Sequence, residues 1–251
     1  MLSIRALKKE ELNLLFKHAY DAKLDVEELH LRCQYTTHSD DFFIAHKDDD
    51  LVGFIVALRH SDEFAFISNF LILPEFQKRG YGTLLLEFAL EHLQNRQIAL
   101  DSDALYKSFY EKAGFRSYFD VDTFLYITKK DSLYHTNLTF KNYQESTSTN
   151  KTNPFLQCLV HNEKTTYISL ETEEILPSYG VSFTYKDGYK IVIDTQKYEH
   201  AKAIFFKLTQ KFERGISIYI EATKLNPIFL NLAYDLEMIL FSKSSRMYNK
   251  V

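Results

Sequence analysis

This sequence contains little of what marks a disordered or a disulfide-stapled chain. Only 7 of its 251 residues are glycine and 4 are proline, whereas 15% are aromatic. Disordered segments have the opposite balance, so we expect a chain that is folded over most of its length. Its two cysteines, Cys33 and Cys158, lie far apart. Two isolated cysteines fit a reducing, cytoplasmic environment in which both are small buried side chains.

The chain also lacks a dominant charge and a long hydrophobic run. The formal net charge is −4 and the pI is about 6.1, so we expect no nucleic-acid partner. No segment approaches the roughly 18 apolar residues of a membrane-spanning helix. Residues 1–11 carry charges where a signal peptide has its apolar core. With 45% hydrophobic residues, the chain can build one large domain or two small ones.

Two of the few glycines stand one residue apart in the stretch Phe70–Thr83, which reads FLILPEFQKRGYGT. An apolar run ends at Pro74, a short basic segment follows, and an apolar helix is predicted over 83–93. A strand, a glycine loop and a helix in this order can bind phosphate, because backbone N–H groups and the helix dipole converge on the anion. The alternative is an ordinary glycine-containing turn.

The residues of this loop indicate which kind of phosphate-containing ligand it binds. It has neither the Lys-Ser or Lys-Thr of a Walker loop nor the three glycines of a Rossmann loop. Instead, Gln77-x-x-Gly80-x-Gly82 resembles the coenzyme A pyrophosphate loop of the GNAT superfamily, the Gcn5-related N-acetyltransferases. The stretch 100–115, LDSDALYKSFYEKAGF, resembles the next GNAT landmark, a strand followed by a short helix that ends in Tyr-Glu-Lys-x-Gly-Phe. The resemblance covers about residues 1–130.

The resemblance implies an α/β fold of the GNAT acyl-CoA N-acyltransferase type, with a mixed sheet. The hydrophobic periodicity agrees with the GNAT order. It predicts strands at 2–7, 41–46, 51–59, 63–73 and 97–100, helices at 8–22, 26–35, 83–93 and 105–113, and a closing hairpin of 115–118 with 123–128. We interpret the acidic run Asp48–Asp50 as a solvated hairpin turn, so no metal is expected.

The second half of the chain predicts a weaker copy of the same pattern. We assign 1–130 to the GNAT domain, the polar stretch 131–154 to a linker, and 155–251 to a degenerate GNAT-like domain. Its predicted strands are 188–194, 216–221, 239–241 and 246–248, and its predicted helices are 199–212 and 227–236. The connection 194–200 contains no glycine, so we do not expect this domain to bind coenzyme A. We expect it to pack on the first domain and shape the acceptor pocket. The two halves, and the pair Arg246-Met247, resemble bacterial two-domain GNAT proteins.

The resemblance also implies the site residues. The strand edge at Phe70, Leu71 and Ile72 would pair with pantetheine, and an N–H near Phe70 would hold the thioester oxygen. The loop would bind the pyrophosphate mainly through main-chain N–H groups. The implied cofactor-binding residues are Phe70, Leu71, Ile72, Gln77, Lys78, Arg79, Gly80, Tyr81, Gly82, Thr83 and Asp103. Lys78 and Arg79 would add charge, or would simply be solvated.

Tyr110 matches the tyrosine that often serves as general acid toward the coenzyme A sulfur. A phenol suits the protonation of a leaving thiolate, although Tyr110 is alternatively a core aromatic residue. The sequence departs from the family at Asp103, where many relatives have asparagine, and at Phe66, where some carry a catalytic glutamate. Candidate bases are Glu63, Asp101 and His38, and deprotonation through water would need none of them.

These observations favour an acetyl-CoA-dependent N-acetyltransferase that acts on a primary amine of a small molecule or peptide by direct attack. The alternative is a coenzyme A-binding regulatory or interaction module without catalysis. The expected partners are acetyl-CoA and the amine acceptor, with neither nucleic acid nor membrane, and a homodimer is compatible with this interpretation.

Overall fold

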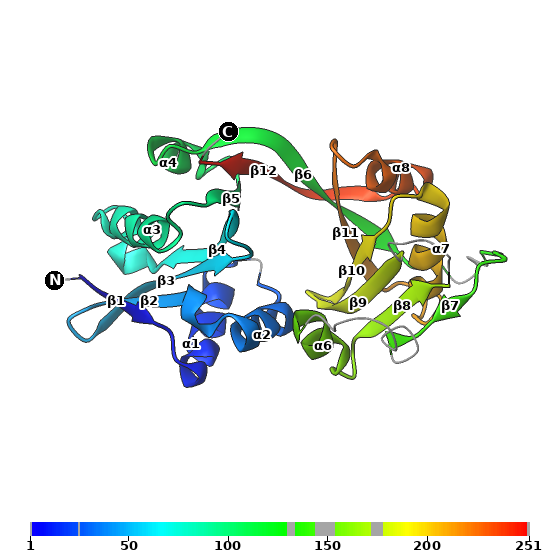
Figure 1. Ribbon diagram of the computed structural model, residues 1–251, viewed down its shortest axis with the longest axis horizontal. Helices are drawn as coiled ribbons and strands as arrows, with labels where there is room; N and C mark the ends of the chain where they lie inside the picture. Colours follow the sequence, from blue (N-terminus) through cyan, green and yellow to red (C-terminus); the bar gives the residue numbers. More distant parts are fainter. Residues whose placement is uncertain (1, 25, 130–133, 144–153, 172–177, 250–251) are drawn as a thin grey trace. The chain divides into compact units, whose positions relative to one another are not determined.

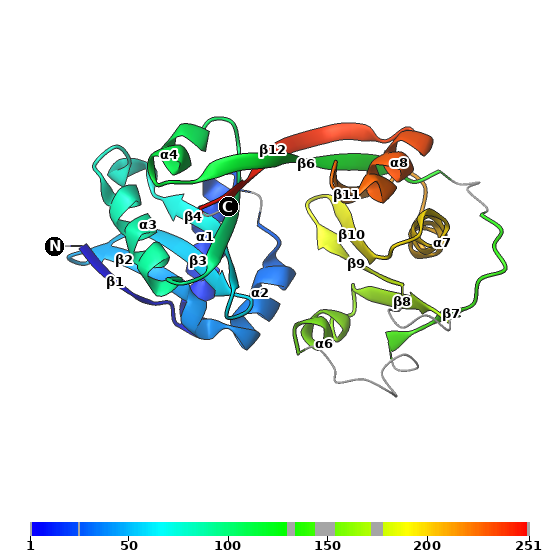
Figure 2. The same cartoon turned by 45° about the horizontal axis from the view of Figure 1, so that its top comes forward.

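The computed structural model describes residues 2–24, 26–129, 134–143, 154–171 and 178–249 (Figures 1 and 2). The chain forms two compact units. The first comprises Met1–Tyr118 together with Ser245–Val251, and the second comprises Phe119–Ser244. The domain boundaries predicted at 130 and 154 stay predictions, because most of the proposed linker lies outside the described residues.

The first unit begins with a strand and two helices and continues as a strand-rich α/β unit. Its elements are β1 (Leu2–Ala6), η1 (Lys9–Glu11), α1 (Leu12–Asp21), α2 (Glu28–Thr37), η2 (Ser39–Asp41), β2 (Phe42–Lys47), β3 (Asp50–Arg59), β4 (Phe64–Ile72), η3 (Pro74–Phe76), α3 (Tyr81–His92), β5 (Gln97–Ser102) and α4 (Lys107–Lys112). This order agrees with the predicted order, and the acidic run forms the β2–β3 hairpin turn.

Helices cover both faces of the first sheet. The ring of Phe42 on β2 contacts Tyr35 on α2, with ring centroids 5.1 Å apart. The neighbouring Phe43 contacts Phe88 on α3 at 5.0 Å. Successive strand residues point to opposite faces, so α2 and α3 lie on opposite sides (Figure 1). This explains why β3 is a nearly continuous apolar run whose residues 52–58 are buried, Gly53 included.

The second unit repeats this plan in shorter form. Its elements are β7 (Phe140–Lys141), α6 (Pro154–Val160), β8 (Thr166–Leu170), β9 (Tyr179–Tyr185), β10 (Gly188–Asp194), α7 (Tyr198–Thr209), β11 (Ser217–Thr223) and α8 (Pro227–Asp235). The predicted start of the last helix is confirmed, because Asn226 Oδ1 accepts a hydrogen bond from the Ile228 N–H at 3.3 Å and Pro227 occupies the first turn. Four of these elements, β7, α6, β8 and β9, were not predicted from the sequence.

Two long strands correct the predicted ends of both domains. The expected hairpin of 115–118 with 123–128 is a single strand, β6 (Arg116–Ile127), and the two expected closing strands of the second domain are one strand, β12 (Ile239–Tyr248). Residues 121–127 of β6 pair with β11 in the second unit. Residues 245–248 of β12 pair antiparallel with β5 in the first unit.

Each unit is therefore closed by a strand from the other half of the sequence. In the first unit β4 and β5 are parallel and β12 is antiparallel to β5. In the second unit β10 and β11 are parallel and β6 is antiparallel to β11. We call this the exchange of closing strands. It places Met247 of β12 in the hydrophobic core of the first unit, where its side chain is fully buried.

Two further expectations can be compared with the structure. Cys33 is fully buried, as expected, but the expectation of reduced thiols is wrong, because the described residues contain no free cysteine. Within the same residues no helix is long and apolar enough to cross a membrane.

Candidate active site

The site begins at an irregularity in β4. Phe54 on β3 is opposite Leu71, whereas Val56 is opposite Ser68, so the pairing shifts between them. Asn69 and Phe70 thus face the single residue Ile55, which defines a β-bulge. Asn69 has a φ of +48°, a left-handed conformation that re-aims the local backbone. The bulge lies at the position where the thioester oxygen is expected.

On the other side of β4, the pairing with β5 ends just before the same place. The parallel pairing of β4 with β5 runs from Phe64 opposite Gln97 to Ile67 opposite Leu100. Residues 68–72 are therefore outside this ladder, which leaves the backbone edge of residues 68–71 to an extended ligand. A peptide-like pantetheine arm could add to such an edge as a strand does.

The loop after β4 is held by its own side chains. Gln77 donates a hydrogen bond from Nε2 to the Ile72 carbonyl at 2.9 Å, so this side chain braces the loop. Phe76 is buried, with its ring centroid 6.0 Å from that of Tyr81. The Arg79 guanidinium lies over the Phe76 ring at 5.9 Å. These contacts fix the loop.

Two residues of the loop have a positive φ. Lys78 has a φ of +58° and Gly80 a φ of +84°. Gly80 is the N-cap residue of α3, and a Cβ there would meet nothing within 4 Å. The glycine thus relieves backbone strain and leaves open space in front of the helix.

The N-terminus of α3 has the free amides that an anion needs. The first intrahelical bond runs from the Leu84 N–H to the Gly80 carbonyl at 3.2 Å, so the N–H groups of Tyr81, Gly82 and Thr83 have no helix carbonyl to bind. Within the described chain no side chain caps this end. These residues therefore suit a pyrophosphate.

Aromatic side chains connect this helix end to Tyr110. A Cβ on Gly82 would lie 3.8 Å from both Phe70 Cζ and Phe109 Cζ. The Tyr110 ring is 6.4 Å from that of Phe70 and 5.2 Å from that of Phe109. The structure thus brings together the predicted acid, the bulged strand and the second loop glycine.

The environment of Tyr110 favours its protonated form. Burial raises the pKa of the phenol above its usual value, and the nearby Tyr106 and Asp103 raise that pKa further. A neutral phenol is a hydrogen-bond donor. Asp103 itself is exposed just before α4, and its carbonyl accepts the Tyr106 N–H at 3.0 Å. Lys78 and Thr83 are also exposed.

The candidate bases do not converge on one place. Glu63 is exposed in the β3–β4 connection, and His38 lies after α2 with Nδ1 2.8 Å from Thr37 Oγ1. Asp101 pairs with Arg246 through both carboxylate oxygens, one of them 2.9 Å from Arg246 Nη2.

Sequence analysis missed the role of Arg246 in the first unit. This arginine on β12 is opposite Asp101 on β5, and its guanidinium also lies 5.0 Å from the ring centroid of Phe66 on β4. It therefore spans the base of the gap between β4 and β5. No local signal could reveal this contact, because its partners lie far away in sequence.

The comparisons with known proteins agree with this geometry. Residues 38–117 match the family model described as "Acetyltransferase (GNAT) domain". A proposed acetyltransferase from Pyrococcus horikoshii has a similar structure, with a TM-score of 0.77 and 15% identity, over 98% of this chain and 88% of that one. A tandem GNAT protein from the clavulanic acid biosynthesis pathway has a TM-score of 0.65 and 9% identity, over 99% and 98% of the two chains. Residues 38–117 of the first unit thus match a GNAT acetyltransferase domain model, and the fold of the whole chain is similar to that of a tandem GNAT protein.

A curated relative matches this chain over only part of its length. The holothin acyltransferase of Pseudoalteromonas sp. (strain SANK 73390) is 24% identical over 86 residues, which cover 34% of this chain and 29% of that protein. The matched part is therefore less than a third of that relative. This similarity concerns only a portion of either chain.

Proposed function

We propose that this protein transfers an acetyl group from acetyl-CoA to a primary amine of a small molecule or peptide. The observation that carries the proposal is that Tyr110, the β4 bulge and Gly82 share one aromatic cluster. An acid, a strand edge and an anion-binding helix end are the parts that thioester aminolysis needs.

In the proposed reaction, the loop amides at 81–83 bind the pyrophosphate and the edge of β4 binds the pantetheine arm. The amine nitrogen attacks the thioester carbon, and the bulge at Asn69–Phe70 places an N–H against the oxygen on which charge develops. The carbon–sulfur bond breaks, and the Tyr110 phenol donates its proton to the departing thiolate. Water takes the proton that the amine loses.

A binding module without catalysis is the second candidate. It is favoured by the lack of a clear base, since Phe66 is apolar and Asp101 is engaged by Arg246. This candidate predicts capture of acetyl-CoA without turnover. Both candidates depend on the glycine loop, so the loop is tested first.

The loop is tested with two matched substitutions, Gly80→Leu and Gly215→Leu. Both glycines have a positive φ, +84° and +91°, and neither would place a Cβ within 4 Å of another atom. The two changes thus carry a similar backbone cost. Saturating acetyl-CoA, at about 100 times its Kd, should stabilise the unmodified protein and Gly215→Leu by about 2.7 kcal/mol.

In Gly80→Leu the side chain blocks the approach to the loop amides, and the thermal shift should disappear. Equal shifts in both variants would contradict the proposed cofactor site. A shift in the unmodified protein without thiol release from acetyl-CoA, across a panel of amines, would favour the binding module.

A further inference from the structure

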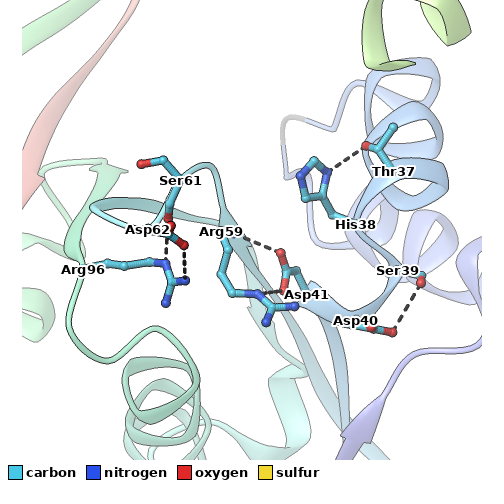
Figure 3. A pocket seen from close by; sticks show the side chains of 9 residues that line it. All are labelled: Thr37, His38, Ser39, Asp40, Asp41, Arg59, Ser61, Asp62 and Arg96. Carbon is cyan, nitrogen blue, oxygen red and sulfur yellow. Dashed lines mark hydrogen bonds and ion pairs between the residues drawn. The ribbon is translucent and has the colours of Figure 1, made fainter. Parts of the chain in front are cut away.

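A second polar site lies in the first unit, at the other end of α3. It is a pocket of about 370 Å³ at the end of α2, the end of β3 and the β3–β4 connection (Figure 3). Its lining is polar throughout: Thr37, His38, Ser39, Asp40, Asp41, Arg59, Ser61, Asp62 and Arg96. The glycine loop precedes α3, whereas His92, which contacts this lining, ends it. A helix of this length spans about 18 Å, so the pocket is separate from the proposed cofactor site.

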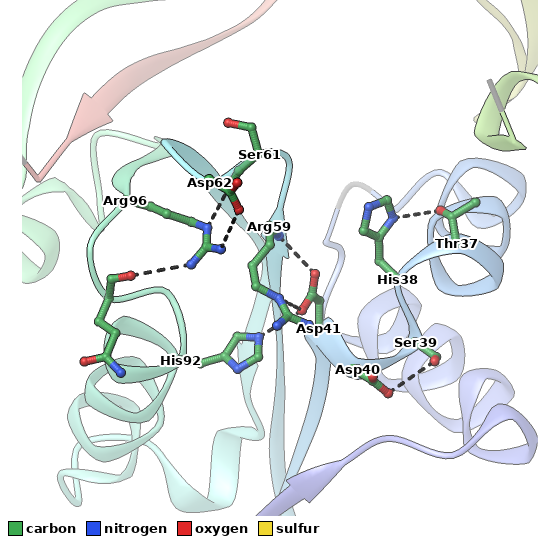
Figure 4. Close-up of polar contacts among 11 residues, drawn as sticks. Thr37, His38, Ser39, Asp40, Asp41, Arg59, Ser61, Asp62, His92 and Arg96 are labelled. Atoms are coloured by element: carbon green, nitrogen blue, oxygen red, sulfur yellow. Dashed lines mark hydrogen bonds and ion pairs between the residues drawn. The ribbon is translucent and has the colours of Figure 1, made fainter. Parts of the chain in front are cut away.

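The deepest acid of the pocket, Asp41, is fully engaged. Its side chain is 1% exposed, and it accepts hydrogen bonds from the Arg59 backbone N–H at 3.0 Å and from Arg59 Nε at 2.6 Å. His92 Nε2 lies 2.9 Å from the same carboxylate (Figure 4). Because an ionised carboxylate only accepts, His92 must donate here. Asp41 therefore fixes the orientation of Arg59 and offers little to a ligand.

Arg59 keeps one edge of its guanidinium for a ligand. Only Nε is engaged by Asp41, and the two terminal nitrogens have no hydrogen-bond partner among the described residues. The side chain is 39% exposed and lines the pocket. A pair of terminal N–H groups in one plane matches a carboxylate, which can bind both at once.

Ser61 also lines the pocket, at the β3–β4 connection. Its Oγ accepts the backbone N–H groups of Glu63 at 3.2 Å and Phe64 at 3.0 Å. Since both of these contacts use the oxygen as acceptor, its own O–H is left to donate. The uncommitted groups of these two lining residues are thus donors.

The charges of the lining bear on how much negative charge a ligand can carry. Arg96 is 20% exposed and held by the Ser61 carbonyl at 2.8 Å. The whole lining has two positive side chains, Arg59 and Arg96, and three negative ones, Asp40, Asp41 and Asp62. Asp62 is fully exposed and 3.9 Å from Arg96, and Asp40 is also exposed. Solvent screens these two rim carboxylates, but they still disfavour a dianion.

We propose that this pocket is a binding site for a small monocarboxylate, held by the terminal nitrogens of Arg59. The site does not depend on the proposed transfer reaction. Its occupancy is measured on the whole 251-residue chain without acetyl-CoA, so the two proposals fail independently.

The test uses propionate, ethylammonium and inorganic phosphate, each titrated at constant ionic strength and followed by ligand-observed NMR. Propionate should bind saturably, phosphate more weakly, and ethylammonium not at all. Arg59→Lys keeps the charge beside Asp41 but loses the planar edge, so propionate should bind about tenfold more weakly or worse. Arg5→Lys is the control, since Arg5 also pairs with a carboxylate, that of Glu11, but lies outside the pocket.

Arg96→Gln is the second variant, and it removes one positive charge without touching Asp41. It should weaken propionate binding several-fold and so tests the site even if Arg59→Lys does not fold. The proposal is wrong if ethylammonium binds as well as propionate, if phosphate binds more tightly, or if neither pocket variant differs from Arg5→Lys.

Discussion

The two units differ most at the connection between a central strand and the helix that follows it. In the first unit, residues 73–80 join β4 to α3 and end in a left-handed glycine. In the second, only residues 195–197 join β10 to α7, and the N-cap residue Lys197 has an extended backbone. The second connection thus has neither the length nor the glycine that opens the first.

Polar side chains at the second connection also form hydrogen bonds with one another. Ser178 Oγ lies 2.8 Å from Thr195 Oγ1 and 2.9 Å from His200 Nδ1, and all three side chains are buried. This network lies where the first unit has an open helix end. The comparison indicates that similar topology can be kept while anion binding is lost, because that capacity depends on a few loop residues.

The strongest prediction places all of the chemistry in the first unit. Tyr110→Phe removes the proposed acid while keeping the ring in its aromatic cluster, so turnover should fall by about 10²- to 10⁴-fold. The acetyl-CoA thermal shift should be unchanged. Tyr198→Phe, at the start of α7, is the control and should leave turnover unaffected. Normal turnover in Tyr110→Phe would remove this residue from the mechanism.

The exchanged strands predict the next largest effect. Met247 on β12 is fully buried in the first core, and Phe124 on β6 is 4% exposed in the second. Met247→Ala should cost about 2–5 kcal/mol and Phe124→Ala about 3–5 kcal/mol of unfolding free energy.

Hydrogen exchange read by peptide can separate the two units. Met247→Ala should weaken protection in β5, and Phe124→Ala in β11, because these are their respective strand partners. The opposite assignment, with Met247→Ala loosening only the second unit, would contradict the exchange.

The sequence predicted the parts of the fold that local chemistry decides. The glycine loop, α3 and the Asn226 cap follow from residue types within one turn of each other, and all appear in the structure. The closing strands could not be predicted in this way. The hairpin predicted for 115–118 with 123–128 needs a turn at 119–122, but Asp120 and Asp122 lie within β6, where Lys243 contacts them at 3.4 and 3.3 Å.

The residues of the candidate site show the same difference between local and long-range features. Gly80, Gly82 and Tyr110 could be proposed from local patterns, whereas Arg246 and the Asp41–Arg59 pair could not. Their contacts join residues that are distant in sequence, and the register between strands is set by the whole sheet. The cofactor-binding role of Gln77 stays a prediction, and the folded loop adds that its side chain donates a hydrogen bond to the Ile72 carbonyl.

A smaller effect is expected at the closed connection of the second unit. Ser178→Ala removes the hydroxyl shared by Thr195 and His200 and leaves buried polar groups without it, which should cost about 1–3 kcal/mol. Denaturant unfolding measures this cost. The acetyl-CoA thermal shift should not change, and a gain of acetyl-CoA binding by the second unit would overturn the view that this network only stabilises the fold.

The smallest expected effect concerns how the stability that one ion pair in each unit contributes depends on pH. Glu11 accepts two hydrogen bonds from Arg5, at 2.8 and 2.6 Å, and one from the Lys8 N–H at 2.8 Å. The Arg5 guanidinium is the main cause that lowers the pKa of this carboxyl from 4.5 to about 2. A lowered pKa stabilises the fold above the unfolded value, and this stability is lost as the pH falls from about 4.5 toward 2.

Glu11→Gln should therefore cost about 1 kcal/mol at neutral pH, a value reduced for solvent screening, and this cost should fall to a small remainder near pH 2. The matched change in the second unit is Glu221→Gln. Glu221 accepts a hydrogen bond from Lys190 Nζ at 2.7 Å and is itself exposed, so its loss should cost less. Urea unfolding of both variants across this pH range measures the difference. A Glu11→Gln deficit that persists undiminished at pH 2 would show that packing, and not the charge of Glu11, stabilises this corner of the first unit.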